Sequence, residues 1–202
     1  MLIICEGPDL CGKSTLADRL RSYISTTTHK EARVIHAGPP LADPISEYVT
    51  PLADYVPGGG ESIILDRWHV GEMVWPGFFG RPTQMGPVEM REIEGFLKER
   101  GALLIRCEMS VTNLERALER AEYEPTSPGD AAHILWLFDD AYLRSMLPQV
   151  SYRRDEEGVL ERDDLIIHFV GCAAREEHRA QKEKRWSSSM TPATSVVGLW
   201  ST

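Results

Sequence analysis

The chain has 202 residues, 42% of them hydrophobic, which is long enough for one well-buried domain and short for two. Its 22 basic and 31 acidic residues give a formal net charge of −9, which argues against a surface that holds duplex nucleic acid by counterion release. No apolar run reaches the roughly 18 residues that a membrane helix needs, so we expect neither a membrane span nor a secretory signal. The 4 cysteines lack CxxC spacing, which indicates neither a zinc site nor a disulfide framework and favours a reducing cytoplasm.

The N-terminal strand and the loop after it form the most informative segment. Residues 2–5 are a continuous apolar run, as in a strand buried on both faces, and residues 14–24 carry leucine and isoleucine on one helical stripe. Between them, residues 7–14 read GPDLCGKS, which has the GxxxxGKS spacing of a phosphate-binding P-loop. Successive backbone N–H groups and the helix N-terminus form an anion nest in such a loop. The pattern therefore predicts binding of a nucleoside triphosphate.

The chemistry of this loop gives its residues separate roles. Lys13 is expected to contact the β- and γ-phosphates of ATP, and the Ser14 hydroxyl is expected to coordinate Mg²⁺. The strand before the loop and the helix after it disfavour a chance match of the pattern. The residues predicted to contact the ATP phosphates are Gly7, Asp9, Leu10, Cys11, Gly12, Lys13, Ser14 and Thr15.

Further along the chain, apolar runs alternate with helical patterns. Strands are predicted at 33–37, 62–66, 102–107 and 165–170, and helices at 44–55, 87–100, 112–121 and 130–147. This alternation predicts an α/β P-loop NTPase fold of three layers, with a five-stranded parallel sheet and helices on both faces. We expect one P-loop domain over residues 1–170, with a short lid at about 116–130, and a C-terminal helix and tail over 171–202 that is either docked or disordered.

A second pattern stands at the end of the strand predicted at 62–66. Three apolar residues are followed by Asp66, Arg67 and Trp68. In P-loop folds the strand beside the P-loop strand delivers an acidic residue to the Mg²⁺ shell, so Asp66 is the second predicted Mg²⁺ ligand. No DxxG follows it and no NKxD occurs in the chain, which favours a kinase over a GTPase switch.

Together these two motifs resemble the thymidylate kinase branch of the nucleoside monophosphate kinases, whose pattern is EGxDxxGKST at the P-loop and DR plus an aromatic residue after the third strand. Here residues 6–15 read EGPDLCGKST and residues 66–68 read DRW. Residues 69–76 are also similar to segments of small phage nucleotide kinases. The resemblance covers roughly residues 1–170, and only the two motifs match closely. It implies a cytoplasmic enzyme of deoxynucleotide biosynthesis, in the host cytoplasm if phage-encoded, and suggests a homodimer.

By this resemblance, Asp9 faces the sugar of the acceptor nucleotide and Arg67 holds the acceptor phosphate beside the γ-phosphate. The assignment of Arg67 also has chemical support, because a bidentate guanidinium at that strand end can clamp a phosphate in line. The alternative for Arg67 is a structural ion pair with Asp66 or Asp9.

The family also uses arginines from the P-loop or from a closing lid. Leu10 follows Asp9 here, so the lid is expected to supply them, and Arg116 and Arg120 lie at i, i+4 on the predicted helix that leads into it. The alternative for both arginines is salt bridging to nearby glutamates on a solvated helix. The predicted catalytic residues are Lys13, Asp66, Arg67, Arg116 and Arg120.

The base and sugar of the acceptor leave weaker signals, because the family's thymine-contact residues are not recognisable here. Aromatic residues within 68–81 offer surface to stack a base, although such residues more often pack in a core. His36 and His69 follow strands at the predicted active edge, where an imidazole can bond a sugar hydroxyl or a base edge, or cap a loop. The predicted substrate-binding residues are Asp9, His36, Arg67, Trp68, His69 and Arg81.

The leading hypothesis is a kinase that transfers the γ-phosphate of MgATP to a (deoxy)nucleoside monophosphate, with a dTMP-like acceptor favoured by the resemblance. A phosphate oxygen is already anionic near neutral pH and needs little help from a base. One alternative is a P-loop kinase that acts on a hydroxyl of a nucleoside, a polynucleotide end or a modified base. Residues 36–38 after the second strand read HAG, where deoxynucleoside kinases place a glutamate, which disfavours the nucleoside version and leaves Asp66 or Asp9 as the base of a polynucleotide version. The other is a P-loop ATPase that acts as a regulatory or binding module.

Overall fold

The structure, a computed structural model, describes residues 1–29, 31–121, 125–153 and 170. In that part of the chain five parallel strands form one sheet in the order β2-β3-β1-β4-β5. The strands are β1 (Leu2–Glu6), β2 (Ala32–His36), β3 (Ser62–Asp66), β4 (Ala102–Glu108) and β5 (Gln149–Arg153). The helices are α1 (Lys13–Thr28), α2 (Pro44–Val49), α3 (Gly71–Phe79), α4 (Pro87–Glu99), α5 (Val111–Arg120) and α6 (Ala131–Arg144), with short 3₁₀ turns at Thr50–Leu52 and Pro128–Asp130.

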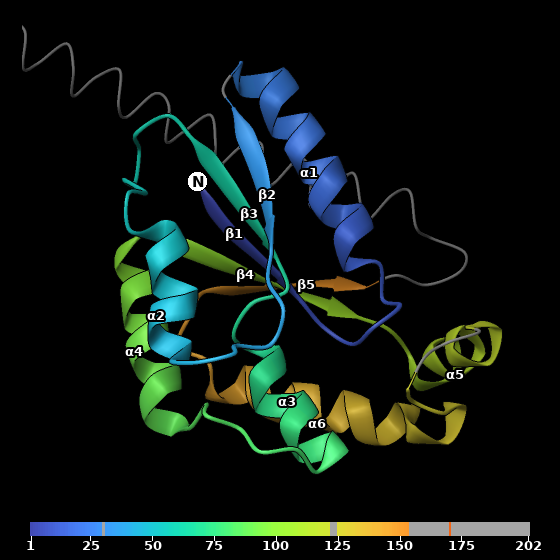
Figure 1. The fold of residues 1–202 in the computed structure, drawn as a ribbon. Coiled ribbons are helices and arrows are strands. Elements are labelled where there is room, and N and C mark those ends of the chain that lie inside the picture. The colour runs from blue at the N-terminus through green and yellow to red at the C-terminus, as the bar shows by residue number, and fades with distance from the viewer. Residues whose placement is uncertain (30, 122–124, 154–169, 171–202) are drawn as a thin grey trace, which may run out of the picture.

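Helices cover both faces of the sheet, which confirms the predicted three-layer α/β fold. Figure 1 shows α1 on one face, and α2, α3, α4 and α6 on the other side. The period-two alternation of β1 explains this division. Leu2 and Ile4 enter the core cluster shared with α2, α4 and α6, whereas Ile3 and Cys5 enter the cluster shared with α1. Because both faces are covered, β1 is apolar over its first four residues and buried throughout.

The order of the strands brings the two sequence motifs together. β1 lies between β3 and β4, and its end carries the P-loop. The register places Cys5 beside Asp66 of β3 and Glu6 beside Arg106 of β4. Crevices beyond the carboxyl ends of parallel strands are where such folds bind ligands. The P-loop and the Asp66–Arg67 turn therefore share one edge of the sheet.

Two predicted helices are longer than those observed. The helix predicted at 44–55 is α-helical only to Val49 and continues as a 3₁₀ turn, where Pro51 has no N–H to donate. The helix predicted at 130–147 ends at Arg144, because Ser145 is extended and the next residues turn toward Glu94.

The fifth strand of the sheet is a different segment from the predicted one. Of the strand predicted at 165–170, residues 165–169 lie outside the described residues, and Val170 is helical and buried. The fifth strand is β5, whose sequence QVSYR has a weak apolar pattern because the strand lies at the sheet edge. Helix α3 was also not predicted, since Gly71, Pro76 and Gly77 are typical of a loop.

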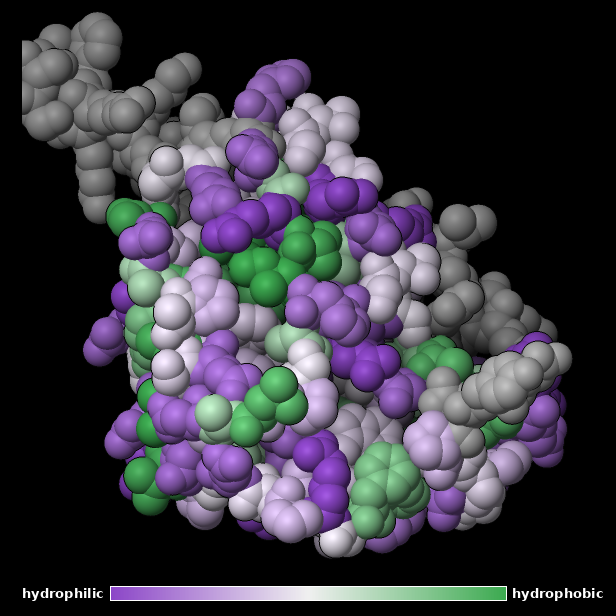
Figure 2. All heavy atoms as spheres, in the orientation of Figure 1, coloured by the Kyte–Doolittle hydropathy of each residue, from purple (hydrophilic) through white to green (hydrophobic). Residues whose placement is uncertain are grey.

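The face of the molecule seen in Figure 2 is largely polar. Figure 2, in the orientation of Figure 1, shows hydrophilic residues over most of the visible face and apolar residues in separate smaller groups. None of the helices in the described part of the chain has the length and apolarity that a bilayer crossing requires.

Glu94 of α4 joins three segments that lie far apart in the sequence. Its carboxylate lies 3.1 Å from Nε2 of His69, in the turn after β3, and accepts hydrogen bonds from the Ser145 hydroxyl and the Met146 N–H after α6. Burial raises the pKa of Glu94, but the hydrogen bonds from His69, Met146 and Ser145 outweigh it, so the pKa lies below its ordinary value. The ionised carboxylate is therefore the form that stabilises the fold.

We expect Glu94→Gln to lower the free energy of unfolding at pH 7 by roughly 2 kcal/mol, since charged hydrogen bonds are lost inside the protein. The folded-state pKa of Glu94 is depressed, so its contribution is fully present above the ordinary value of 4.5 and is lost as the pH falls through the lower folded value. Urea unfolding at pH 7 and between pH 5 and 3 should show this loss in the wild type and not in the variant. The exposed Glu92→Gln is the control. An equal pH dependence in wild type and Glu94→Gln would contradict the assignment.

Candidate active site

The P-loop follows β1 and reverses the chain through unusual backbone angles. Gly7, Leu10 and Gly12 have positive φ angles of 154°, 65° and 85°. A Cβ atom on Gly7 would lie only 2.2 Å from the carbonyl oxygen of Cys107, so no other residue fits there without a shift of the backbone. This close approach holds the loop against the end of β4.

The start of α1 offers donors for an anion. Its N-cap residue, Gly12, has no side chain to cap the helix, so the first N–H groups stay available for a ligand. Lys13 is buried, and its ammonium donates to the carbonyl oxygen of Pro8 and lies 3.5 Å from Oδ1 of Asp9. Ser14 and Thr15 are exposed on the first turn. The loop therefore fits the phosphates of a nucleotide.

Arg67 also forms an ion pair with Asp9. Its Nη2 is 2.8 Å from Oδ1 of Asp9, the same oxygen that Lys13 approaches. The sequence left open an ion pair of Arg67 with Asp66 or Asp9, and the pair observed is with Asp9. Arg67 also has a positive φ of 64°, which is uncommon for a residue other than glycine and frequent at functional sites. This backbone turns the arginine away from the strand direction and toward the P-loop.

Asp66 ends β3 beside the P-loop strand and is buried. Its Oδ2 lies 3.1 Å from Nδ1 of His36, and its Oδ1 is buried without a hydrogen-bond partner in the described part of the chain. A buried carboxylate oxygen without a partner is costly unless an ion or water binds it, so Asp66 fits a cation site. Mg²⁺ prefers oxygen ligands and keeps waters and phosphate oxygens in its shell, so Ser14 and Asp66 are the residues that would hold it together with those ligands. When bound there, the ion would neutralise negative charge on the phosphates of a nucleotide.

Glu6, the last residue of β1, has a structural role that no sequence motif predicted. Its Oε1 accepts backbone hydrogen bonds from Trp68, Val70 and Gly71 at 2.7, 3.1 and 3.4 Å, and its own carbonyl oxygen accepts one from the hydroxyl of Tyr142. Burial raises the pKa of Glu6 against the opposing effects of His69, the Trp68 N–H and Lys13. The signal in the sequence was a charged residue in an apolar strand immediately before the P-loop.

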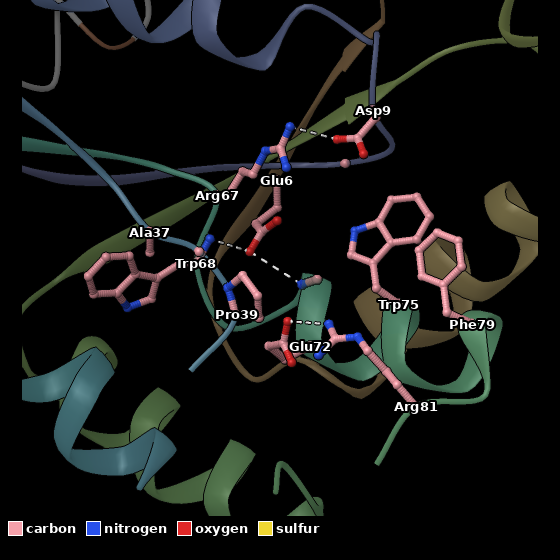
Figure 3. A pocket seen from close by; sticks show the side chains of 13 residues that line it. Glu6, Asp9, Ala37, Pro39, Arg67, Trp68, Glu72, Trp75, Phe79 and Arg81 are labelled. Atoms are coloured by element: carbon pink, nitrogen blue, oxygen red, sulfur yellow. Dashed lines mark hydrogen bonds and ion pairs between the residues drawn. The ribbon is translucent and has the colours of Figure 1, made fainter. Parts of the chain in front are cut away.

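A pocket of about 300 Å³ opens between the P-loop and α3. Figure 3 shows an ion pair at either end of it, Arg67 with Asp9 near the P-loop and Arg81 with Glu72 opposite. Apolar groups form the sides. The residues that line it are Glu6, Gly7, Asp9, Ala37, Gly38, Pro39, Arg67, Trp68, Gly71, Glu72, Trp75, Phe79 and Arg81.

The predicted substrate-binding residues are therefore only partly brought together. Asp9, Arg67 and Arg81 line the pocket. Trp68 lines it too, but its side chain is 3% exposed and its ring packs on Tyr48 at 5.2 Å between centroids, so it does not offer a face to a base.

The two histidines lie outside the pocket lining. The side chain of His69 has no exposed surface and lies against Glu94, because tertiary packing buries the turn that carries it, so the structure does not bring it to the pocket. His36 lies next to the lining residue Ala37 and contacts Asp66.

Arg116 and Arg120 lie on α5, away from the residues that line the pocket. Nε of Arg120 donates to the carbonyl oxygen of Arg116 at 3.0 Å. Residues 122–124 of the expected lid lie outside the described residues, and residues 116–120 belong to α5 itself. The catalytic role of these arginines stays a prediction.

Comparison with known proteins relates the chain to solved structures and not to a sequence family. No family model and no curated protein matches it. The YorR protein of Bacillus subtilis, solved in complex with phosphorylated GDP, matches with a TM-score of 0.66 and 23% identity, over 84% of this chain and 95% of that one. Deoxyadenosine kinase from M. mycoides, solved with bound dCTP, matches with a TM-score of 0.48 and 13% identity, over 85% of this chain and 100% of that one. The likeness to YorR shows a shared fold.

We expect Glu6→Ala to lower the free energy of unfolding by roughly 2 to 4 kcal/mol, because it leaves buried N–H groups without an acceptor. Glu6→Gln keeps an oxygen at the same place and should cost much less. The raised folded-state pKa of Glu6 means that the wild type gains stability relative to Glu6→Gln as the pH falls through that value, and the gain levels off below 4.5. Urea unfolding of the three proteins from pH 7 to pH 4 tests this. Equal losses in the two variants would show that the oxygen is not needed.

Proposed function

We propose that the protein transfers the γ-phosphate of ATP to a (deoxy)nucleoside monophosphate. The observation that carries the proposal is the carboxylate shared by two cations, with Lys13 at 3.5 Å and Arg67 at 2.8 Å from the same oxygen of Asp9. Lys13 belongs to the donor loop and Arg67 lines the pocket. Phosphoryl transfer is mainly positioning and charge neutralisation, which needs a donor-side and an acceptor-side cation a few ångströms apart.

Each group then has a defined task. The N–H groups of the P-loop and Lys13 would hold the β- and γ-phosphates of ATP, and Ser14 and Asp66 would hold Mg²⁺. Arg67 exchanges Asp9 for the acceptor phosphate, and Asp9 becomes free to bond the acceptor sugar. Arg116 and Arg120 complete the set of positive charges when the lid closes. The structure of YorR with phosphorylated GDP supports a nucleotide site on this fold.

The identity of the base depends on the far end of the pocket. Both motifs that resemble thymidylate kinases lie at the phosphate end, so they do not fix the base, and the dTMP-like acceptor stays an expectation of the resemblance. The class of acceptor, a monophosphate, depends on Arg67 and on the P-loop.

A hydroxyl acceptor is the second candidate, because three carboxylates line the same pocket. Glu6, Asp9 and Glu72 all contribute to its lining, and a hydroxyl nucleophile needs a base of this kind. The two candidates differ in whether a phosphate or a hydroxyl is placed beside Arg67.

A coupled assay of ADP release over dTMP, dCMP, dGMP, dAMP and the matching nucleosides separates these candidates. We expect turnover with monophosphates. Arg67→Ala should raise the KM for the acceptor about 10- to 100-fold and change the KM for ATP much less, since it removes a charged hydrogen bond to the acceptor. Lys13→Ala should lower kcat by roughly 100-fold or more.

Arg33→Ala is the control, since Arg33 forms an exposed pair with Glu61 outside the pocket lining. Phosphorylation of nucleosides alone would overturn the monophosphate assignment. If Arg67→Ala raised the KM for ATP as much as the KM for the acceptor, Arg67 would belong to the ATP side of the site. Rapid ATP hydrolysis without any acceptor would favour the ATPase alternative.

A further inference from the structure

Helix α3 builds a second ion pair at the end of the pocket opposite the P-loop. Glu72 lies in its first turn, and Gly80 ends the helix in a left-handed conformation with φ 62°. That turn folds the chain back, so the N–H of Arg81 bonds the carbonyl oxygen of Pro76 and its Nη2 lies 2.9 Å from Oε1 of Glu72. Figure 3 shows this pair across the pocket from Arg67 and Asp9.

The pair keeps groups available for a ligand. The side chain of Glu72 is 7% exposed and that of Arg81 is 35% exposed, and both line the pocket. Their bond uses one carboxylate oxygen and one guanidinium nitrogen, whereas a carboxylate has two acceptor oxygens and a guanidinium has five N–H donors. The far end of the pocket therefore presents acceptors beside donors.

The remaining walls suit a flat ring. Trp75 and Phe79 stand on one side, with ring centroids 5.7 Å apart and planes inclined by 20°. Ala37 and Pro39 stand on the opposite side in Figure 3. With the acceptor phosphate on Arg67, as the proposed function requires, a base attached to the same sugar would lie between these walls.

We infer that this pocket selects a base whose hydrogen-bonding edge carries both an exocyclic amino group and a carbonyl, namely guanine or cytosine, over thymine or uracil. The inference rests on the proposed function. Guanine presents one acceptor and two adjacent donors, which match one N–H of Arg81 and both oxygens of Glu72. Cytosine presents one donor and two acceptors, which match one oxygen of Glu72 and two N–H groups of Arg81.

Thymine and uracil fit this pair less well. Their N3–H lies between two carbonyl oxygens, so a carboxylate that accepts from N3–H brings its second oxygen toward a carbonyl. That contact is repulsive, and a buried polar group is left without a partner, which is how polar sites reject analogues. Adenine offers one donor and one acceptor and so leaves part of the pair unused.

The test is calorimetric binding of dGMP, dCMP, dTMP and dAMP to the full chain, together with kcat/KM for each. We expect dGMP or dCMP to bind about 10- to 100-fold more tightly than dTMP, the discrimination of a good bidentate contact. Tighter binding of dGMP would identify guanine as the preferred base, and tighter binding of dCMP would identify cytosine. Either result supports the inference. Binding of dTMP as tight as both, or binding of none of the four, would overturn it.

Glu72→Gln tests the pair directly. A glutamine offers one acceptor and one donor, which match N3–H and O4 of thymine, so the ratio of dTMP to dGMP or dCMP affinity should rise at least about 10-fold. Arg81→Lys keeps the charge without the planar fork and should reduce selectivity with little change in melting temperature. Glu61→Gln, in the exposed pair with Arg33, is the matched control. An equal change of all four affinities in Glu72→Gln would overturn the inference.

The outcomes also separate this inference from the proposed function. Efficient phosphate transfer with dTMP as the preferred acceptor would contradict the base preference and support the proposed function. Preferential binding of dGMP or dCMP, without phosphate transfer to any of the monophosphates, would contradict the proposed function and support the base preference.

Discussion

The hydrogen bonds of Glu6 hold the candidate site together. One carboxylate oxygen at the end of the P-loop strand accepts three backbone N–H groups from the turn that follows β3 and starts α3. The same residue receives the hydroxyl of Tyr142 from α6 on its carbonyl oxygen. Glu6 therefore fixes the positions of the P-loop, the turn that carries Arg67 and the start of α3 relative to one another. Burying this carboxylate costs free energy, as its raised pKa shows, and the three N–H bonds offset that cost.

Charge is arranged along the site in pairs. In a chain with a net charge of −9, each of the cations Lys13, Arg67 and Arg81 lies within ion-pair distance of a carboxylate. Such pairs position flexible side chains, and a phosphate can replace the carboxylate in them because its anionic oxygens accept from the same N–H donors. Asp9 serves two cations at once, Lys13 on the P-loop and Arg67 after β3.

Much of the fold could be predicted because its signals are local. The apolar runs of β1, β3 and β4 and the amphipathic pattern of α4 were recognised within about two residues of their bounds. Helix α3 and strand β5 were not recognised. α3 contains Gly71, Pro76 and Gly77, whose low helix propensity is overcome by the Glu6 bonds at its start and by packing against α6. β5 is paired on one side only and carries few apolar residues.

By itself, the sequence determined the P-loop, the parallel α/β architecture and the position of Asp66 and Arg67 at a strand end, because each depends on spacing along the chain. Only the tertiary structure decided which side chains face the pocket. His69 and Trp68 are adjacent to Arg67 in sequence, yet packing against Glu94 and Tyr48 buries them. Glu72 and Arg81, nine residues apart, meet only because a left-handed glycine reverses the chain after α3. Contacts of this kind depend on burial and chain reversal, which no local pattern encodes.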